Sequence, residues 1–99
     1  MSNKYKLTIK EEASFEISDA YEWYESKQVN LGGKFKKHLL KTFKSILANP
    51  MSFQVLFNNH RQAVVSKFPF VVIFETFDVN VVVYAVFHTS QDPKKKNRM

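Results

Sequence analysis

Three side chains in this 99-residue sequence could take part in acid–base or phosphate chemistry. His88 follows the apolar run at residues 81–87 and precedes polar residues, so a strand ending there would present its imidazole to solvent. An imidazole can act as a general acid or base near neutral pH. Arg61 and Lys67 bracket an earlier apolar run, where either cation could hold a phosphate or a carboxylate. These residues are the candidate site residues of the chain.

Each candidate also has a structural interpretation. A histidine at a strand end can hydrogen-bond the neighbouring backbone and order the segment that follows. Lys67 can be a solvated charge at the end of a strand, an interpretation that fits Arg61 less well. Residue types and spacing leave these alternatives open.

Several kinds of site have no counterpart in the sequence. A Gly-rich phosphate loop, a His-Glu-x-x-His motif and a Gly-x-Ser-x-Gly motif are all missing, and the histidines at positions 38, 60 and 88 lie far apart. The acidic residues mostly decorate the first predicted helix, where they do not form the facing pair of a glycoside hydrolase. We therefore expect no cofactor and no metal.

Length and composition predict one domain over residues 1–99, with residues 89–99 as a basic polar tail. With 44% apolar residues, the chain can bury a core without a disulfide or a metal to support it. Cysteine is absent, the N-terminus lacks the apolar core of a signal peptide, and no apolar run could span a bilayer. We expect a cytoplasmic protein.

The positive charge of the chain points to an anionic partner. The formal charge is +6 and the pI about 9.6, with the excess clustered in the second predicted helix and the tail. Nucleic acid, a nucleoprotein or an acidic protein would each be attracted by this charge. Alternatively the charge has no partner, as in many soluble basic domains.

The N-terminal half of the sequence reads as a strand and a helical hairpin. Residues 4–10 alternate between polar and apolar side chains, as in a half-buried strand. A helical stripe begins after Glu12. Its members are Ala13, Ile17, Ala20, Tyr21 and Tyr24. Phe15 and Trp23 fall off this stripe, and we expect them to pack under the tail or the neighbouring helix; alternatively they remain available to a partner.

Gly32 and Gly33 predict a hinge between the two helices. The second helix has an apolar stripe and an outward lysine face, and it ends at Pro50. Its stripe comprises Phe35, Leu39, Phe43 and Ile46, and its lysine face comprises Lys37, Lys41 and Lys44.

After an irregular stretch at residues 51–59 with a turn at Asn58-Asn59, the runs 62–67, 70–75 and 81–87 read as a meander of antiparallel strands. The predicted fold class is α+β. An N-terminal strand and an antiparallel helical hairpin pack on one face of a mainly antiparallel four-stranded sheet. We expect the opposite face to be open to function.

Several landmarks, in order, resemble the RelE/ParE superfamily of bacterial toxins. They are Asn49-Pro50, Arg61, Phe68-Pro69-Phe70, and the segment 86–93 with His88. The resemblance spans nearly the whole chain and implies the toxin, or plasmid stabilisation protein, of a type II toxin-antitoxin system. It also implies an unstable antitoxin that wraps and neutralises the toxin.

The superfamily contains two mechanisms, and the departures of this sequence help to choose between them. RelE-like members cleave mRNA on the ribosome, and His88, Arg61 and Lys67 would be the catalytic residues of such a nuclease. ParE-like members block DNA gyrase. Val71 and Gln91 occupy positions where superfamily members tend to carry arginine. By analogy with oxyanion donors, one such cation is often worth about 2.7–4 kcal/mol of barrier.

We therefore expect a ParE-like toxin that binds an essential target, with gyrase the expected one, and has no enzymatic activity. One alternative is a metal-independent endoribonuclease that acts on mRNA at the ribosome. Another is a non-toxic basic domain that binds RNA or protein. Gln91 also fits a weakened or orphan toxin. The sequence leaves the antitoxin's identity open, and the oligomeric state too, whether a dimer or a toxin-antitoxin complex.

Overall fold

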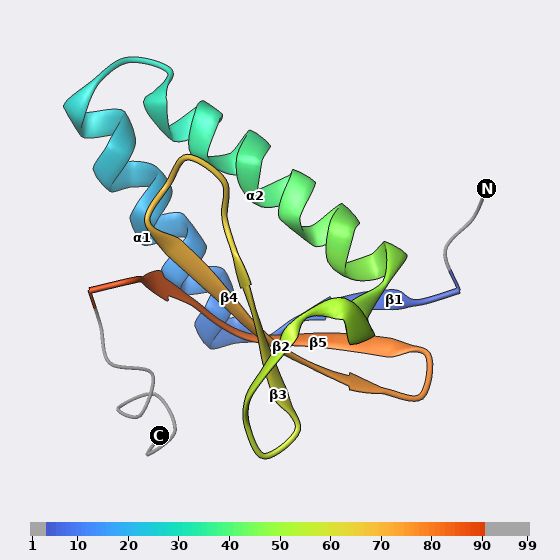
Figure 1. Cartoon of the computed structure of the whole chain (residues 1–99). Coiled ribbons are helices and arrows are strands. Elements are labelled where there is room, and N and C mark those ends of the chain that lie inside the picture. The colour runs from blue at the N-terminus through green and yellow to red at the C-terminus, as the bar shows by residue number, and fades with distance from the viewer. Residues whose placement is uncertain (1–3, 91–99) are drawn as a thin grey trace.

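The computed structural model describes residues 4–90, which form a helical hairpin on one face of a mixed five-stranded sheet (Figure 1). The elements in chain order are β1 (Lys6–Ile9), α1 (Glu11–Lys27), α2 (Leu31–Ala48), the 3-10 turn η1 (Pro50–Ser52), β2 (Gln54–Phe57), β3 (His60–Val64), β4 (Phe70–Phe77) and β5 (Asn80–His88). The predicted α+β class and the hairpin on one face are confirmed. No helix among these residues is long and apolar enough to cross a membrane.

The strand order is β1-β5-β4-β3-β2, and every neighbouring pair is antiparallel except β1 with β5. A parallel pair requires a long crossover connection, which the helical hairpin and the following strands provide. β1 pairs with only the first part of β5, from Lys6 opposite Asn80 to Ile9 opposite Val83. The last part of β5 therefore extends beyond the end of β1.

The prediction of four strands was wrong because the stretch expected to be irregular contains β2. Asn58 takes a left-handed conformation with φ 49°, which closes a tight hairpin between β2 and β3. The bulge between Val55 and Phe57 interrupts the pairing of these two strands. β2 is thus a short, irregular edge strand, whose periodicity is too brief to recognise in the sequence.

The turn between the helices does not use the glycines as a hinge, so that prediction was wrong as well. Asn30 supplies the left-handed residue with φ 73°, while Gly32 and Gly33 lie in the first turn of α2. A Cβ on Gly32 would come 2.6 Å from the carbonyl oxygen of Tyr21, whereas one on Gly33 would meet nothing within 4 Å. Gly32 is therefore needed where α2 crosses close to the backbone of α1.

The main core lies between the hairpin and the sheet. The α2 stripe and its partners from α1, β4 and β5 are buried there. A second, smaller cluster lies on the opposite face of the sheet, as the strand alternation requires. Its members are Val71, Ile73, Ala85 and Phe87, each 3–7% exposed, with Leu56 packed against them. This end of the opposite face is buried, which corrects the expectation of an open face.

The outward sides of the helices differ from the expectation in one respect. The lysine face of α2 is exposed as predicted. Phe15 and Trp23 of α1 were expected to be packed, but they are 63% and 57% exposed. Both lie off the buried stripe of α1 and point away from the core, so their side chains remain available to a partner.

Candidate functional site

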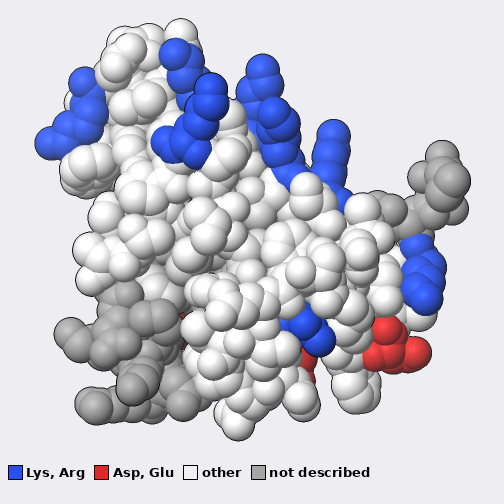
Figure 2. Space-filling model, in the orientation of Figure 1, with Lys and Arg blue, Asp and Glu red and all other residues white. Residues whose placement is uncertain are grey.

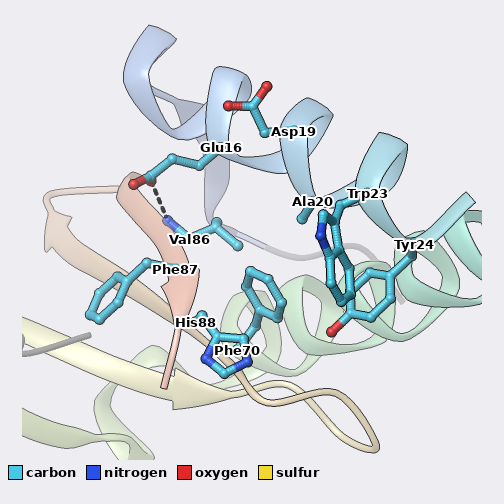
Figure 3. Close-up of a pocket in the computed structure, with 9 residues that line it drawn as sticks. All are labelled: Glu16, Asp19, Ala20, Trp23, Tyr24, Phe70, Val86, Phe87 and His88. Atoms are coloured by element: carbon cyan, nitrogen blue, oxygen red, sulfur yellow. Dashed lines mark hydrogen bonds between the residues drawn. The ribbon is translucent and has the colours of Figure 1, made fainter. Parts of the chain in front are cut away.

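A pocket of about 370 Å³ lies between α1 and the end of β5; we refer to it as the α1–β5 pocket (Figure 3). It forms where β1 stops at Ile9 and leaves the end of β5 without a neighbouring strand on that side among the described residues. The residues that line it are Glu16, Asp19, Ala20, Trp23, Tyr24, Phe70, Val86, Phe87 and His88. The candidate residue His88 is therefore part of a larger concave site.

Glu16 joins the two sides of this pocket. Its Oε1 accepts a hydrogen bond of 2.8 Å from the backbone N–H of Val86, as the dashed line in Figure 3 marks. This N–H would point into the gap beyond the end of β1, and an unpaired buried N–H is costly. The carboxylate therefore holds α1 against β5 and fixes the depth of the pocket.

The wall formed by α1 is aromatic. The rings of Trp23 and Tyr24 meet edge to face with centroids 5.1 Å apart, and Tyr24 packs in the same way on Phe70 at 6.0 Å. Burial raises the pKa of Tyr24 further above physiological pH, where the phenol is already neutral. Lys27 places its Nζ 5.0 Å from the centroid of the Trp23 ring. This wall offers a rigid apolar surface with a carboxylate, that of Asp19, beside it.

His88 lies at the rim, directly opposite Phe70 in the sheet register. Its ring stands edge-on to the Phe70 ring with centroids 5.4 Å apart. The backbone N–H of Ser90 donates to Nδ1 at 3.1 Å, so a neutral imidazole carries its proton on Nε2. The Ser90 hydroxyl is also 2.9 Å from Nδ1. His88 thus orders the turn after β5, while its side chain remains exposed.

Arg61 lies in a different part of the molecule. Its guanidinium donates to the carbonyl oxygens of Phe53 at 2.7 Å and Met51 at 3.4 Å, which fastens β3 to the segment around η1. Arg61 pairs with Phe74, whereas His88 pairs with Phe70. The two residues lie on opposite sides of β4 and are offset by about 13 Å along the strand direction, because each strand residue advances about 3.3 Å.

Lys67 lies in the loop between β3 and β4 with a left-handed φ of 67°, next to α2. Its neighbour Ser66 places its hydroxyl 2.9 Å from Nδ1 of His38. Partial burial lowers the pKa of His38, and so do the ammonium groups of Lys41, Lys67 and Lys37 in turn. Lys67 therefore lies beside the basic surface of α2. The structure does not bring Arg61 together with His88.

The sequence analysis missed most of the α1–β5 pocket. Asp19 and Tyr24 had no signal beyond helix periodicity, and Phe70 was noted only as part of the Phe68-Pro69-Phe70 landmark. Trp23 had a signal, because it falls off the buried stripe of its helix. Gln91 and the basic run at residues 94–96 lie outside the described residues. Within residues 4–90 no group of three or more His, Cys, Asp or Glu side chains could hold a metal ion.

Comparisons with known proteins agree with this fold. A chain of a solved structure titled "Chromosomal ParDE TA system from P. aeruginosa" superposes with a TM-score of 0.74 at 12% identity. The match covers 88% of this chain and 98% of that one. No curated protein sequence matches significantly.

The sequence also matches a protein family. The model of the family described as "ParE toxin of type II toxin-antitoxin system, parDE" matches residues 7–93, a range that includes every described element after the first residue of β1. The resemblance to the RelE/ParE superfamily, on its ParE side, is thereby confirmed. The chain belongs to the family of ParE toxins of type II toxin-antitoxin systems.

Proposed function

We propose that this toxin arrests growth by binding DNA gyrase in the cytoplasm and that its cognate antitoxin neutralises it by occupying the α1–β5 pocket. The proposal rests on the family match over residues 7–93 and on the separation of His88 from Arg61. The first indicates a ParE toxin, and the second favours binding over RNA cleavage.

The separation matters because RNA cleavage without a metal needs cations fixed beside the phosphate while a nearby group transfers the proton. Near His88, the described residues offer the carboxylates of Glu16 and Asp19, which would repel a phosphate. Arg61 is held by two carbonyl oxygens on another part of the sheet. This arrangement supports inhibition by binding.

The α1–β5 pocket has the features of a protein-binding site. Aromatic residues that combine an apolar ring with a rigid position often supply most of the energy at protein interfaces. Trp23 is 57% exposed at the mouth of the pocket, and its ring would lose that exposure under a partner. Asp19 provides a carboxylate beside the apolar wall. We propose that the antitoxin inserts an apolar side chain and places a lysine or arginine near Asp19.

The gyrase proposal is tested with purified toxin in a DNA supercoiling assay and, in parallel, with translating extracts in which mRNA integrity is followed. We expect supercoiling to be inhibited and the mRNA to stay intact. Intact supercoiling together with cleaved mRNA would overturn the proposal and favour the endoribonuclease.

His88→Ala separates these mechanisms more clearly than a change at Arg61. The side chain of His88 is exposed, whereas Arg61 holds η1 to β3 and its loss would also affect folding. A toxin that acts by binding gyrase should retain most of its inhibition in His88→Ala. A nuclease that uses this imidazole for proton transfer should lose about 10²-fold or more in rate.

A further inference from the structure

The outward side of α2 carries a row of lysines without any acidic neighbour on the same helix. We call this row the α2 ridge and define it as Lys34, Lys37, Lys41 and Lys44, all exposed. The spacing of three or four residues places them along one side of the helix, over about 15 Å at a rise of 1.5 Å per residue. Figure 2 shows blue side chains along this part of the surface, and the red side chains visible in this view lie lower down, away from α2.

The surrounding sequence leaves this charge uncompensated. No Asp or Glu occurs between Glu25 and Glu75, a stretch that includes all of α2, β2 and β3. Lys67 adds a fifth ammonium beside the ridge, on the loop that contacts His38. Uncompensated like charges on one helix repel one another. An arrangement of this kind is favourable when an anion relieves the repulsion.

We propose that the α2 ridge binds the phosphate backbone of duplex DNA. The assignment to DNA, as distinct from RNA, rests on the proposed function, because gyrase acts on duplex DNA and a toxin bound to it would meet that duplex. Four ammonium groups along about 15 Å can each reach a phosphate, since neighbouring phosphates on one strand of B-DNA lie only several ångströms apart.

Residue types along the ridge favour nucleic acid over an acidic protein. Lysine is depleted at protein interfaces, where arginine and aromatic residues dominate, but it commonly contacts phosphates. The aromatic residues of α2, Phe35 and Phe43, are buried in the core and cannot stack on bases. Proteins that bind single strands use exposed aromatic rings for that purpose. A double-stranded backbone therefore fits the ridge best.

The test is fluorescence anisotropy with a labelled 20-base-pair DNA duplex, titrated with the full chain at several salt concentrations. The ridge variant is Lys37→Gln/Lys41→Gln/Lys44→Gln. The matched control is Lys10→Gln/Lys27→Gln/Lys36→Gln, which removes the same charge from lysines outside the defined ridge, whose Nζ atoms lie over the rings of Tyr84, Trp23 and Tyr21. The natural tail is present in every protein, so differences between variants report on the ridge.

Each phosphate contact contributes about −0.9 to the slope of log affinity against log salt. We expect the ridge variant to lose about 2.7 of that slope and about 10²-fold or more in affinity at 0.1 M salt, while the control loses less than about a third of that slope. Thermal melting curves of the three proteins establish that all are folded.

Several outcomes would contradict the binding of DNA by the α2 ridge. Equal losses in the ridge variant and the control, or no binding of the natural chain to the duplex at 50 mM salt, would overturn the assignment. Tighter binding to an RNA duplex or to polyglutamate of similar length would overturn the choice of DNA. Inhibition of supercoiling without duplex binding would contradict this inference but not the proposed function. Duplex binding without inhibition of supercoiling would contradict the proposed function but not this inference.

Discussion

The two helices of the hairpin lie side by side, yet their outward surfaces have opposite character. α1 carries most of the acidic residues of the chain and the exposed aromatics Phe15 and Trp23, whereas α2 carries lysines and no acidic residue. Their buried sides nevertheless contribute to the same core. Core packing therefore does not explain the difference in charge, which points to separate partners for the two surfaces.

The two surfaces also differ in the way in which each would bind a partner. The α1–β5 pocket is concave, aromatic and fixed by the hydrogen bond from Val86 to Glu16, which suits a partner that inserts a side chain. The α2 ridge is a row of exposed lysines on the outer side of a helix, which suits a regular array of phosphates. Substitutions that affect one surface but not the other can therefore separate the two interactions.

The largest effect in the comparison is expected for Trp23→Ala in binding to the cognate antitoxin. Removing an anchoring aromatic at the pocket mouth should weaken affinity by about 30-fold or more, corresponding to a loss of at least about 2 kcal/mol. Isothermal titration calorimetry measures this loss. The matched control is Phe15→Ala, which removes an exposed aromatic of α1 that does not line the pocket. Equal losses of affinity in both variants would contradict the proposal that the antitoxin binds in the α1–β5 pocket.

The contact between the helices is tested by a pair of glycine substitutions. Gly32→Ala should destabilise the protein by about 1–3 kcal/mol, because the new methyl group would press on the Tyr21 carbonyl of α1. Gly33→Ala should instead stabilise it by about 0.5–1 kcal/mol, since the methyl meets open space and favours the helix. Urea unfolding measures both. If the two substitutions shift stability in the same direction, the close approach at Gly32 is not as described.

One acidic residue of α1 caps the N-terminus of α2. The carboxylate of Glu25 accepts hydrogen bonds from the backbone N–H groups of Asn30 and Gly32, both at 2.9 Å, at the positive end of α2. Glu25→Ala should therefore cost about 1 kcal/mol of stability. Glu22→Ala, an exposed acid of the same helix, should change stability by less than about 0.5 kcal/mol. Chemical unfolding of both variants gives the comparison, and similar losses would contradict the capping role.

The smallest effect concerns His38, between α2 and the β3–β4 loop. Because its pKa is lowered in the folded state, the unfolded chain takes up this proton first as the pH falls below about 6.5. The contribution of His38 to stability is thus fully present at higher pH and is lost as the pH falls from there through the folded pKa. His38→Gln should flatten the decline in thermal stability between pH 7.5 and 5, and added salt should shrink the difference. An unchanged pH profile would show that neither burial nor the nearby lysines lower the pKa of His38 in the folded chain.

Periodicity was enough to predict the helices, the central strands and the packing of the hairpin on one face of the sheet. The turn between the helices was harder to predict. Its left-handed residue is Asn30, whereas the sequence suggested that Gly32 and Gly33 would form the turn. Gly32 is required by a close contact between two helices, which no local pattern encodes. β2 was missed because a four-residue edge strand is too short to show an alternation.

The candidate site was less predictable than the fold for a physical reason. The α1–β5 pocket depends on the length of β1 relative to β5 and on a hydrogen bond between residues 16 and 86, and both are properties of the folded chain. His88 was recognised because it ends an apolar run, whereas Asp19 became a pocket residue through the packing of α1 beside β5, and Phe70 through the register of β4 with β5. The lysine face of α2 could be predicted, because charge on one side of a helix is already visible in the sequence.

Inhibition of gyrase and its relief by the antitoxin are tested most directly by measuring supercoiling activity while toxin, and then cognate antitoxin, are added in increasing amounts. We expect the toxin alone to inhibit supercoiling and an equimolar amount of antitoxin to restore it. With Trp23→Ala toxin, restoration should require about 30-fold more antitoxin when the assay is run near the dissociation constant. Full supercoiling activity in the presence of toxin at concentrations that arrest growth would contradict the proposal that the toxin acts on gyrase.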